Sequence, residues 1–166
     1  MLTANPMQDF THIDAQGNAV MVDVGKKEKS IRRAAATGRI LMCPECYQAV
    51  RRGATQKGDV LGVARIAGIM AVKQTGSLIP LCHTLPIEHA SIGFDFDDRE
   101  CSVIAYCTVQ TTGATGVEME ALTGVSVTLL TVYDMCKAID KSMELGKIYL
   151  MEKTGGKSGV YQNKGI

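Results

Sequence analysis

The amino-acid sequence predicts an α+β sandwich, with helices packed on one face of an antiparallel sheet. Two long segments carry apolar residues at helical spacing, and two adjacent segments alternate between apolar and polar residues as hairpin strands do. With one further strand at each end, the order becomes strand, helix, strand, strand, helix, strand. This order is the split βαβ arrangement of a ferredoxin-like fold.

The first half of the chain contains turns, one strand and two helices. Its helix and strand signals are apolar periodicity, a proline in a first helical turn and Asp59 as a helix cap. Residues 18–24 fit either a short strand or an extended arm. The remaining elements expected here are a turn at 14–17, a strand at 33–42, a short helix at 44–52, and a helix at 58–75.

The second half supplies the hairpin and the longest helix. The polar run Asp97–Glu100 separates the two alternating segments and predicts the hairpin turn. Gly146 is interpreted as a break before the last strand, and the Gly- and Lys-rich residues from Lys153 are expected as a tail. The elements expected here are strands at 90–96 and 101–109, a helix at 117–141, and a strand at 148–151.

The composition is typical of one globular domain. The 166 residues are 46% apolar and 21% charged, with no Trp, 3 Phe, 9 Met and 17 Gly. Such small side chains predict close packing between layers, with Met filling irregular gaps. We expect a flexible lead-in at 1–17, a single domain at 18–159 and a C-terminal tail at 160–166.

Charge and targeting signals exclude several classes of protein. The net charge of +1 argues against broad binding to nucleic acid or an anionic membrane, although it allows a local basic site. The first ten residues lack the features of a signal peptide, and no charge-free stretch reaches the length of a membrane span. We therefore expect a cytoplasmic protein whose thiols are reduced.

Cys43 and Cys46 form a CxxC pair, the pattern of some zinc and redox sites. A structural zinc site usually needs a second pair or suitably spaced histidines, and the three histidines at 12, 83 and 89 are scattered. We therefore expect no metal site. A zinc or redox module would depend on these two cysteines alone.

Four segments place polar groups beside glycine or proline. Lys57 precedes a helix N-terminus, where it either binds an anion or is simply solvated. Pro80 and Pro86 restrain a loop in which His83 either contacts a phosphate or a reacting group, or is tied to backbone carbonyls. The tail from Lys153 to Gly159 either approaches a phosphate through its glycines or is a basic extension; its spacing is not that of a Walker A loop.

The fourth segment is the longest predicted helix. Asp134 and Lys137 are three residues apart and share a helix face, and Glu120 lies near the same stripe, almost four turns earlier. Opposite charges on one face suit acid–base chemistry because each fixes the protonation state of its neighbour. An ordinary surface ion pair explains the same spacing.

Together these segments resemble the cyclic pyranopterin monophosphate synthase family, the molybdenum cofactor biosynthesis protein C family. The similar stretches run from about Thr11 to Gly159. They are FTHID, MVDV, KGDVLGVARIAGIMAVKQTGSLIPLCHTLP, TGVEMEALTGVSVTLLTVYDMCKAIDK and EKTGGKSG. The chain departs from the family pattern at Thr84, at Ala114 and in the Cys43–Cys46 pair.

The resemblance implies a ferredoxin-like fold in a homohexamer, a trimer of dimers with active sites at subunit interfaces. It implies conversion of 3′,8-cyclo-7,8-dihydroguanosine 5′-triphosphate, supplied by a radical-SAM GTP 3′,8-cyclase, into cyclic pyranopterin monophosphate and pyrophosphate. No resident cofactor is implied, although Mg²⁺ can accompany the triphosphate. A non-catalytic subunit that binds nucleotide phosphates is the alternative, and it would not need Asp134 or Lys137.

The resemblance also implies roles for individual residues in the domain at 18–159. The acid–base residues are Asp134, Lys137 and Lys57. The loop residues Leu81, Cys82 and His83 contact the substrate, as do Glu118, Met119 and Glu120. The residues that handle the triphosphate are Arg32, Lys153 and Lys157.

Overall fold

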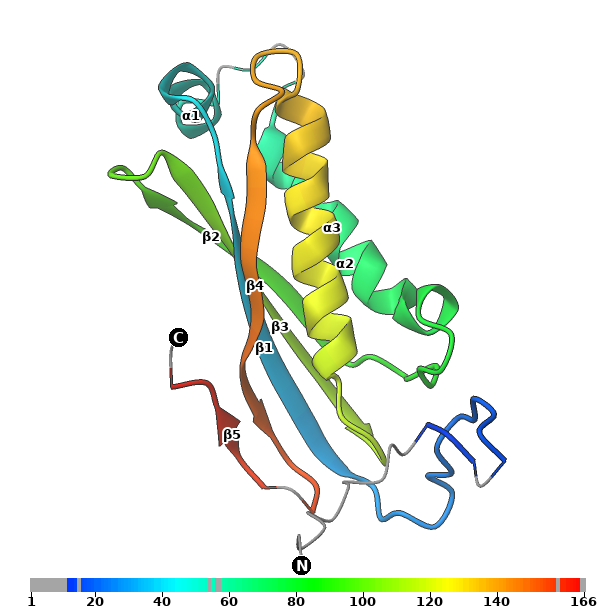
Figure 1. The fold of residues 1–166 in the computed structure, drawn as a ribbon. Helices are drawn as coiled ribbons and strands as arrows, with labels where there is room; N and C mark the ends of the chain where they lie inside the picture. The colour runs from blue at the N-terminus through cyan, green and yellow to red at the C-terminus, as the bar shows by residue number, and fades with distance from the viewer. Residues whose placement is uncertain (1–11, 15, 54, 56–57, 158, 165–166) are drawn as a thin grey trace, which may run out of the picture.

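A computed structural model describes residues 12–14, 16–53, 55, 58–157 and 159–164 (Figure 1). Its sheet has the strand order β2-β3-β1-β4-β5, and every neighbouring pair is antiparallel. This topology confirms the predicted α+β fold of the ferredoxin-like type. The elements in chain order are β1 (Ser30–Leu41), α1 (Pro44–Arg51), α2 (Val60–Leu78), β2 (His89–Asp97), β3 (Ser102–Gly113), α3 (Glu118–Cys136), β4 (Glu144–Thr154) and β5 (Tyr161–Gln162).

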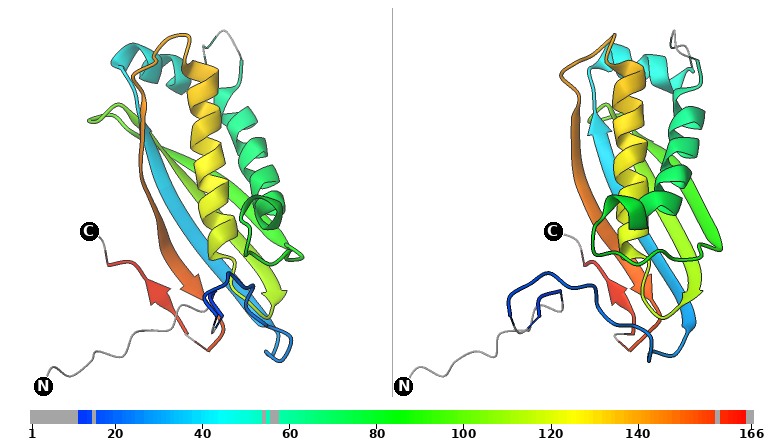
Figure 2. Two further views of the ribbon diagram at one scale, coloured as in Figure 1. Left: turned by 45° about the vertical axis from the view of Figure 1, so that its right-hand side comes forward. Right: turned by 90° about the vertical axis from the view of Figure 1, so that its right-hand side faces the viewer.

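Helices α2 and α3 lie side by side on one face of the sheet (Figure 2). Alternate residues of the strands, such as Ala36 and Ile40 of β1 and Val103 of β3, are buried beneath them. From α3, Val125 and Leu129 complete this core. None of the helices in the described residues is long and apolar enough to cross a membrane.

Helices α2 and α3 approach closely because each carries a glycine where it packs against the other. A Cβ added to Gly124 of α3 would lie 2.7 Å from the Cys107 sulfur and 2.8 Å from a methyl group of Val72. One added to Gly68 of α2 would collide with the hydroxyl of Thr128 and lie 3.1 Å from the Gly124 carbonyl oxygen. The predicted packing through small residues is thus present at this contact.

The predicted long helix is wrong at its C-terminal end, which lies at Cys136 and not at residue 141. The last helical bond runs from the Lys137 amide to the Tyr133 carbonyl at 2.8 Å. The Asp140 carboxylate then accepts hydrogen bonds from the Ser142 amide, at 2.8 Å, and hydroxyl, at 2.6 Å. This local bonding competes with the helical pattern and turns the chain toward β4.

The last long strand is much longer than predicted, because Gly146 lies within β4 instead of breaking it. The register between β1 and β4 shifts near this glycine, and the next residue, Lys147, has φ 48°. A bulge therefore absorbs the irregularity and the strand continues. The other elements differ from expectation by a few residues at their ends, and β5 lies within the segment expected as a tail.

Residues 18–24 form an extended arm, the second of the two interpretations, with only an isolated bridge between Ile13 and Ala19. Figure 1 shows this arm near the N-terminal end of α3, where β4 also ends. The arm therefore adds a wall at this end of the molecule. The residues of the 14–17 turn that are described agree with the prediction, since Gly17 donates its amide to the Asp14 carbonyl at 3.0 Å.

We predict that Gly68→Ala destabilises the protein by roughly 1–3 kcal/mol, the usual cost of overpacking a core. In an exposed helix the same change stabilises by nearly 1 kcal/mol, so the sign reports the helix crossing. Urea unfolding followed by circular dichroism measures the change. Gly93→Ala is the control, because a Cβ there meets nothing within 4 Å. A Gly68→Ala protein as stable as the wild type would mean that the helices are not held this closely.

Candidate active site

The Arg32 side chain binds two backbone carbonyl groups at the end of the sheet where the arm lies. Its Nε donates to the Gly113 carbonyl at 3.1 Å, and a terminal nitrogen donates to the Ala114 carbonyl at 3.4 Å. The turn after β4 lies directly on this side chain: Gly155 and Gly156 have φ of 93° and 77°, and a Cβ on Gly156 would collide with the guanidinium. These positions thus require glycine for both conformation and space.

Lys153 of β4 and Glu118, the first residue of α3, form an ion pair beside Arg32. Lys153 Nζ lies 3.0 Å from Glu118 Oε1, and both side chains are about one-quarter exposed. The pair joins the end of β4 to the start of α3. Its partial burial makes it firmer than a fully exposed surface pair.

A cavity of about 860 Å³ opens between these residues and the segment that joins the arm to β1. That segment contributes Lys26, Lys27 and Lys29, called the arm lysines below. Its lining contains seven basic side chains and two acidic ones. The excess of positive charge, together with the glycine turn, suits an anion that carries several phosphates. The basic residues are Lys26, Lys27, Lys29, Arg32, Arg33, Lys153 and Lys157.

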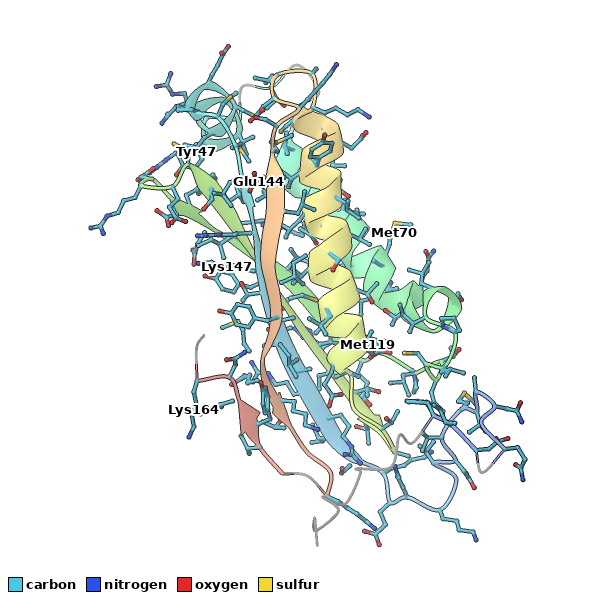
Figure 3. All side chains as sticks on the ribbon, viewed as in Figure 1. Tyr47, Met70, Met119, Glu144, Lys147 and Lys164 are labelled. Atoms are coloured by element: carbon cyan, nitrogen blue, oxygen red, sulfur yellow. The ribbon has the colours of Figure 1, made fainter. Side chains whose placement is uncertain are left out.

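A second cavity of about 400 Å³ adjoins the first and shares Lys27, Thr115, Gly116 and Glu118 with it. Apolar and polar groups alternate in its wall. Met119, labelled in Figure 3, lies at the start of α3 where this cavity is found. All six residues predicted to contact the substrate from the loop at 81–83 and from the start of α3 line this cavity: Leu81, Cys82, His83, Glu118, Met119 and Glu120.

His83 is bonded to a backbone carbonyl, as the second interpretation of the proline-bounded loop expects. Its Nε2 lies 2.9 Å from the Val22 carbonyl oxygen, so Nε2 carries a proton and donates it. The bond ties the arm to the loop, and the same ring lines the second cavity. His83 is therefore fixed in orientation at the wall of the site.

Glu120 is an unusual carboxyl group for such a site, because its side chain is buried. Burial raises the pKa of Glu120, and the nearby charge of Glu118 raises it further, against a backbone hydrogen bond that lowers it. Burial also raises the pKa of the Cys82 thiol, with Glu120 as the next cause. Both groups therefore favour their neutral forms, in which each can donate a proton.

Asp134 and Lys137 lie at the other end of α3. They form an ion pair at 2.7 Å, and their side chains are 60% and 51% exposed. The hydrogen bond and charge of Asp134 raise the pKa of Lys137. The charged form of this lysine is therefore favoured, and in this form it cannot accept a proton. The pair has the geometry of a surface ion pair in the single subunit.

One subunit does not bring this pair to the cavities. Asp134 follows Glu118 by 16 residues on one continuous helix, which separates them by about 24 Å. Neither Asp134 nor Lys137 lines either cavity. Glu120 is near the same helical stripe, as predicted, but it is buried near the cavities while Asp134 is exposed far from them.

The remaining predicted residues fall into two groups. Arg32, Lys153 and Lys157, the residues predicted to handle the triphosphate, line the first cavity, and Glu118 lines both cavities. Lys57 lies outside the described residues. Helix α2 begins at the end of the helical layer where α3 ends (Figure 1). Asp59 caps α2 as expected, accepting the Gly62 amide at 2.8 Å.

The arm lysines and Arg33 were not predicted as site residues. Lys26, Lys27 and Lys29 belong to a basic cluster that is visible in the sequence, and that cluster was the available signal. They line the same cavity as Lys157, which follows more than a hundred residues later, and no local sequence pattern predicts this proximity.

The CxxC pair acts as a helix start. Cys43 is the N-cap of α1, and its sulfur accepts the Cys46 amide at 3.5 Å, with Pro44 in the first turn. Among the described residues, no group of three or more His, Cys, Asp or Glu side chains is arranged to hold a metal ion.

We predict that Glu120→Gln raises the melting temperature near neutral pH. A carboxyl group whose pKa is raised on folding binds a proton that the unfolded chain has lost, so stability falls as pH rises from its ordinary value of 4.5 through the folded pKa. Gln is neutral throughout, so the variant's advantage should be full above the folded pKa and vanish below 4.5. Calorimetry across this pH range measures it.

The exposed Glu144, on β4, supplies the control Glu144→Gln, which makes the same substitution at a side chain that is not buried and should leave the melting temperature nearly unchanged. A Glu120→Gln protein less stable than the wild type at high pH would mean that the buried carboxylate is stabilised in its charged form.

Comparisons with known proteins identify the family of the chain. The family model described as "MoaC family" matches residues 21–156. A cyclic pyranopterin monophosphate synthase of Clostridium botulinum is 55% identical over 93% of this chain and 98% of its own length. A protein of the same name from Natranaerobius thermophilus is 50% identical over 95% of this chain and 99% of its own length. Another, from Chloroflexus aurantiacus, is 53% identical over 93% of this chain and 94% of its own length. The chain belongs to the MoaC family.

Proposed function

We propose that the protein converts 3′,8-cyclo-7,8-dihydroguanosine 5′-triphosphate into cyclic pyranopterin monophosphate and pyrophosphate, in molybdenum cofactor biosynthesis. The observation that carries the proposal is the pair of adjoining cavities, one rich in cations and one of mixed polarity. A nucleotide-derived substrate has the same two parts, a triphosphate and a heterocycle. The name shared by the relatives supports the same activity.

The first cavity receives the triphosphate. Arg32, Lys153 and Lys157 neutralise its charge, assisted by the arm lysines. The last bond to form joins a sugar-derived hydroxyl to the α-phosphate and expels pyrophosphate. This displacement needs an in-line approach and positive charge on the leaving group, and the basic lining supplies that charge.

The second cavity receives the heterocycle, in contact with Leu81, Cys82 and Met119. Opening the purine five-membered ring and closing the pyranopterin requires several proton transfers. Glu120 is suited to donate a proton because burial raises the pKa of its carboxyl group and so favours the protonated form. His83, fixed by its bond to the Val22 carbonyl, is a second group able to transfer one.

Asp134 and Lys137, with Lys57, supply the remaining acid–base groups of the proposal. Since a single subunit separates Asp134 from Glu118 by about 24 Å, a second subunit must bring its own pair to the cavities. We therefore propose a homohexamer, a trimer of dimers, with active sites at the subunit interfaces.

The outer surface of the helical layer supports this assembly. Val63, Ile66 and Met70 of α2 are 45%, 61% and 53% exposed, and their spacing places them on one side of the helix. Figure 3 shows Met70 pointing away from α3. Leu130 of α3 is 56% exposed as well. An apolar stripe of this kind is typical of a subunit interface.

The proposal includes a radical-SAM GTP 3′,8-cyclase as the source of the substrate, and a cytoplasmic location. It assigns no resident cofactor, and Mg²⁺ enters only with the triphosphate. The direct test is to incubate the purified protein with the cyclised GTP substrate and measure pyrophosphate and the pyranopterin product. Substrate binding without either product would favour a non-catalytic phosphate-binding subunit instead.

We predict that Asp134→Asn lowers turnover by at least about 10²-fold, the usual loss when one acid–base group is removed. Lys137→Ala should have a similar effect. The melting temperature should remain nearly normal, because an exposed ion pair contributes only about 0.5 kcal/mol. Turnover, thermal unfolding and substrate binding are measured on the same preparations.

The matched control is Asp98→Asn, which removes a different exposed ion pair, with Arg51. This variant should turn over at the wild-type rate. Wild-type turnover in Asp134→Asn would remove Asp134 from the chemistry, and inactivity accompanied by unfolding would assign the pair a structural role.

We also predict that two inactive variants complement each other when mixed. Lys153→Ala damages the cavity of its own subunit, whereas Asp134→Asn damages the site to which that subunit contributes. After co-refolding, half of the sites in each mixed dimer receive both intact parts, so about a quarter of wild-type activity should return. Co-refolding two cavity variants, Lys153→Ala and Arg32→Ala, should restore none. No recovery in the first mixture would place both groups in one subunit's site.

A further inference from the structure

Three thiols and a carboxylate meet where α1 begins and α3 ends. Cys46, in the first turn of α1, is fully buried, and its thiol lies close enough to that of Cys136, the last residue of α3, for Cys136 to raise its pKa. Cys43, the N-cap of α1, is only partly buried. Its amide donates to Asp140 Oδ2 at 2.7 Å. Figure 2 shows α1 at the end of the helical layer where α3 terminates.

The backbone already places Cys43 and Cys46 at disulfide distance. The Tyr47 amide donates to the Cys43 carbonyl at 3.0 Å, which closes a helical turn over these residues. Residues three apart in such a turn have Cα atoms about 5 Å apart, within the range of roughly 4.4–6.8 Å that disulfides span. The Cys43 sulfur also lies 3.5 Å from the Cys46 amide nitrogen. Little backbone movement is therefore needed to join the two sulfurs.

The two thiols differ as the partners of a redox pair should. Cys43 is only partly buried and lies at the N-terminus of α1, so its sulfur can be reached from solvent. Cys46 is enclosed, and burial, followed by the proximity of Cys136, raises the pKa of Cys46 to about 12. The accessible sulfur can thus meet an oxidant while the buried one stays protonated until a partner forms beside it.

We propose that Cys43 and Cys46 form a redox-active dithiol, which a hydroperoxide oxidises to a disulfide. In the first step, the Cys43 sulfur attacks the peroxide, the O–O bond breaks, and the products are the Cys43 sulfenic acid and an alcohol, or water from hydrogen peroxide. In the second step, the Cys46 sulfur attacks the Cys43 sulfur and water leaves. The two thiols supply the two electrons that reduce the peroxide.

Formation of this disulfide would change two contacts at the C-terminal end of α3. A Cys43–Cys46 bond draws the Cys46 sulfur away from Cys136, and it alters the turn whose amide binds Asp140. Lys137 directly follows Cys136, and Asp134 precedes it by two residues. If this pair acts in the proposed reaction, the disulfide lowers turnover by on the order of 10- to 100-fold, the scale of loss that small misplacements cause. This consequence depends on the proposed function, whereas the disulfide does not.

The test treats the reduced full-length protein with hydrogen peroxide, alkylates the remaining thiols and maps the bonds by mass spectrometry. We expect a Cys43–Cys46 disulfide that dithiothreitol reverses. Cys43→Ser should abolish it and keep the fold, since Ser is a good N-cap. Cys101→Ser, a change in another partly buried cysteine, should leave it intact.

A Cys46–Cys136 disulfide, or no disulfide at peroxide levels that oxidise Cys43, would overturn the assignment. Tightly bound zinc in the purified protein would overturn it as well. The turnover of oxidised and re-reduced protein is measured separately. Full activity in the oxidised form would remove the link to α3, while a protein inactive in both forms would count against the proposed function and leave the mapped disulfide standing.

Discussion

Helix α3 is a rigid spacer, and the organisation of the proposed site follows from its length. Its first turn holds Glu118 and Glu120 against the two cavities, and its last turn holds Asp134 beside Lys137. An unbroken α-helix rises about 1.5 Å per residue, so no side-chain rearrangement brings these two ends together. The structure therefore separates substrate binding from part of the proposed acid–base chemistry, unless a second subunit closes the gap.

The state of the ion pair fits that separation. In the single subunit, Asp134 raises the pKa of Lys137, which holds the lysine in its charged form. Covering the pair with another subunit's cationic cavity would remove water and add like charge beside the lysine, and both effects favour its neutral form. Assembly would thus create the acid–base group as well as position it. The exposed apolar stripe on α2 would give such an assembly a surface on which to form.

The fold could be predicted from the sequence because its signals are local. Alternation defined the β2–β3 hairpin, and helical spacing with Asp59 as a cap defined α2. The errors arose where a bulge or a side-chain hydrogen bond overrides the periodic pattern of the sequence. Gly146 lies in a strand because a bulge absorbs it, and α3 ends early because Asp140 bonds to Ser142 and to the Cys43 amide.

The site could be predicted only in part, for the same reason. The glycine turn at 155–156 and the loop of His83 are local motifs, and the structure places both at the cavities. The arm lysines form a cluster that is visible in the sequence. That they line the same cavity as Lys157 depends on the path of the chain before β1, which no local pattern predicts. Helical spacing related Glu120 to Asp134 as members of one stripe, yet it did not reveal that one is buried and the other exposed at opposite ends of the helix.

The central claim is that each active site combines the cavities of one subunit with the ion pair of another. A crystal structure of the assembled protein with pyrophosphate bound tests it most directly. The account predicts pyrophosphate in contact with Arg32 and Lys153 of one subunit, with Asp134 and Lys137 of a second subunit facing the same enclosed space. An assembly in which Asp134 and Lys137 face solvent, far from any bound pyrophosphate, would contradict it.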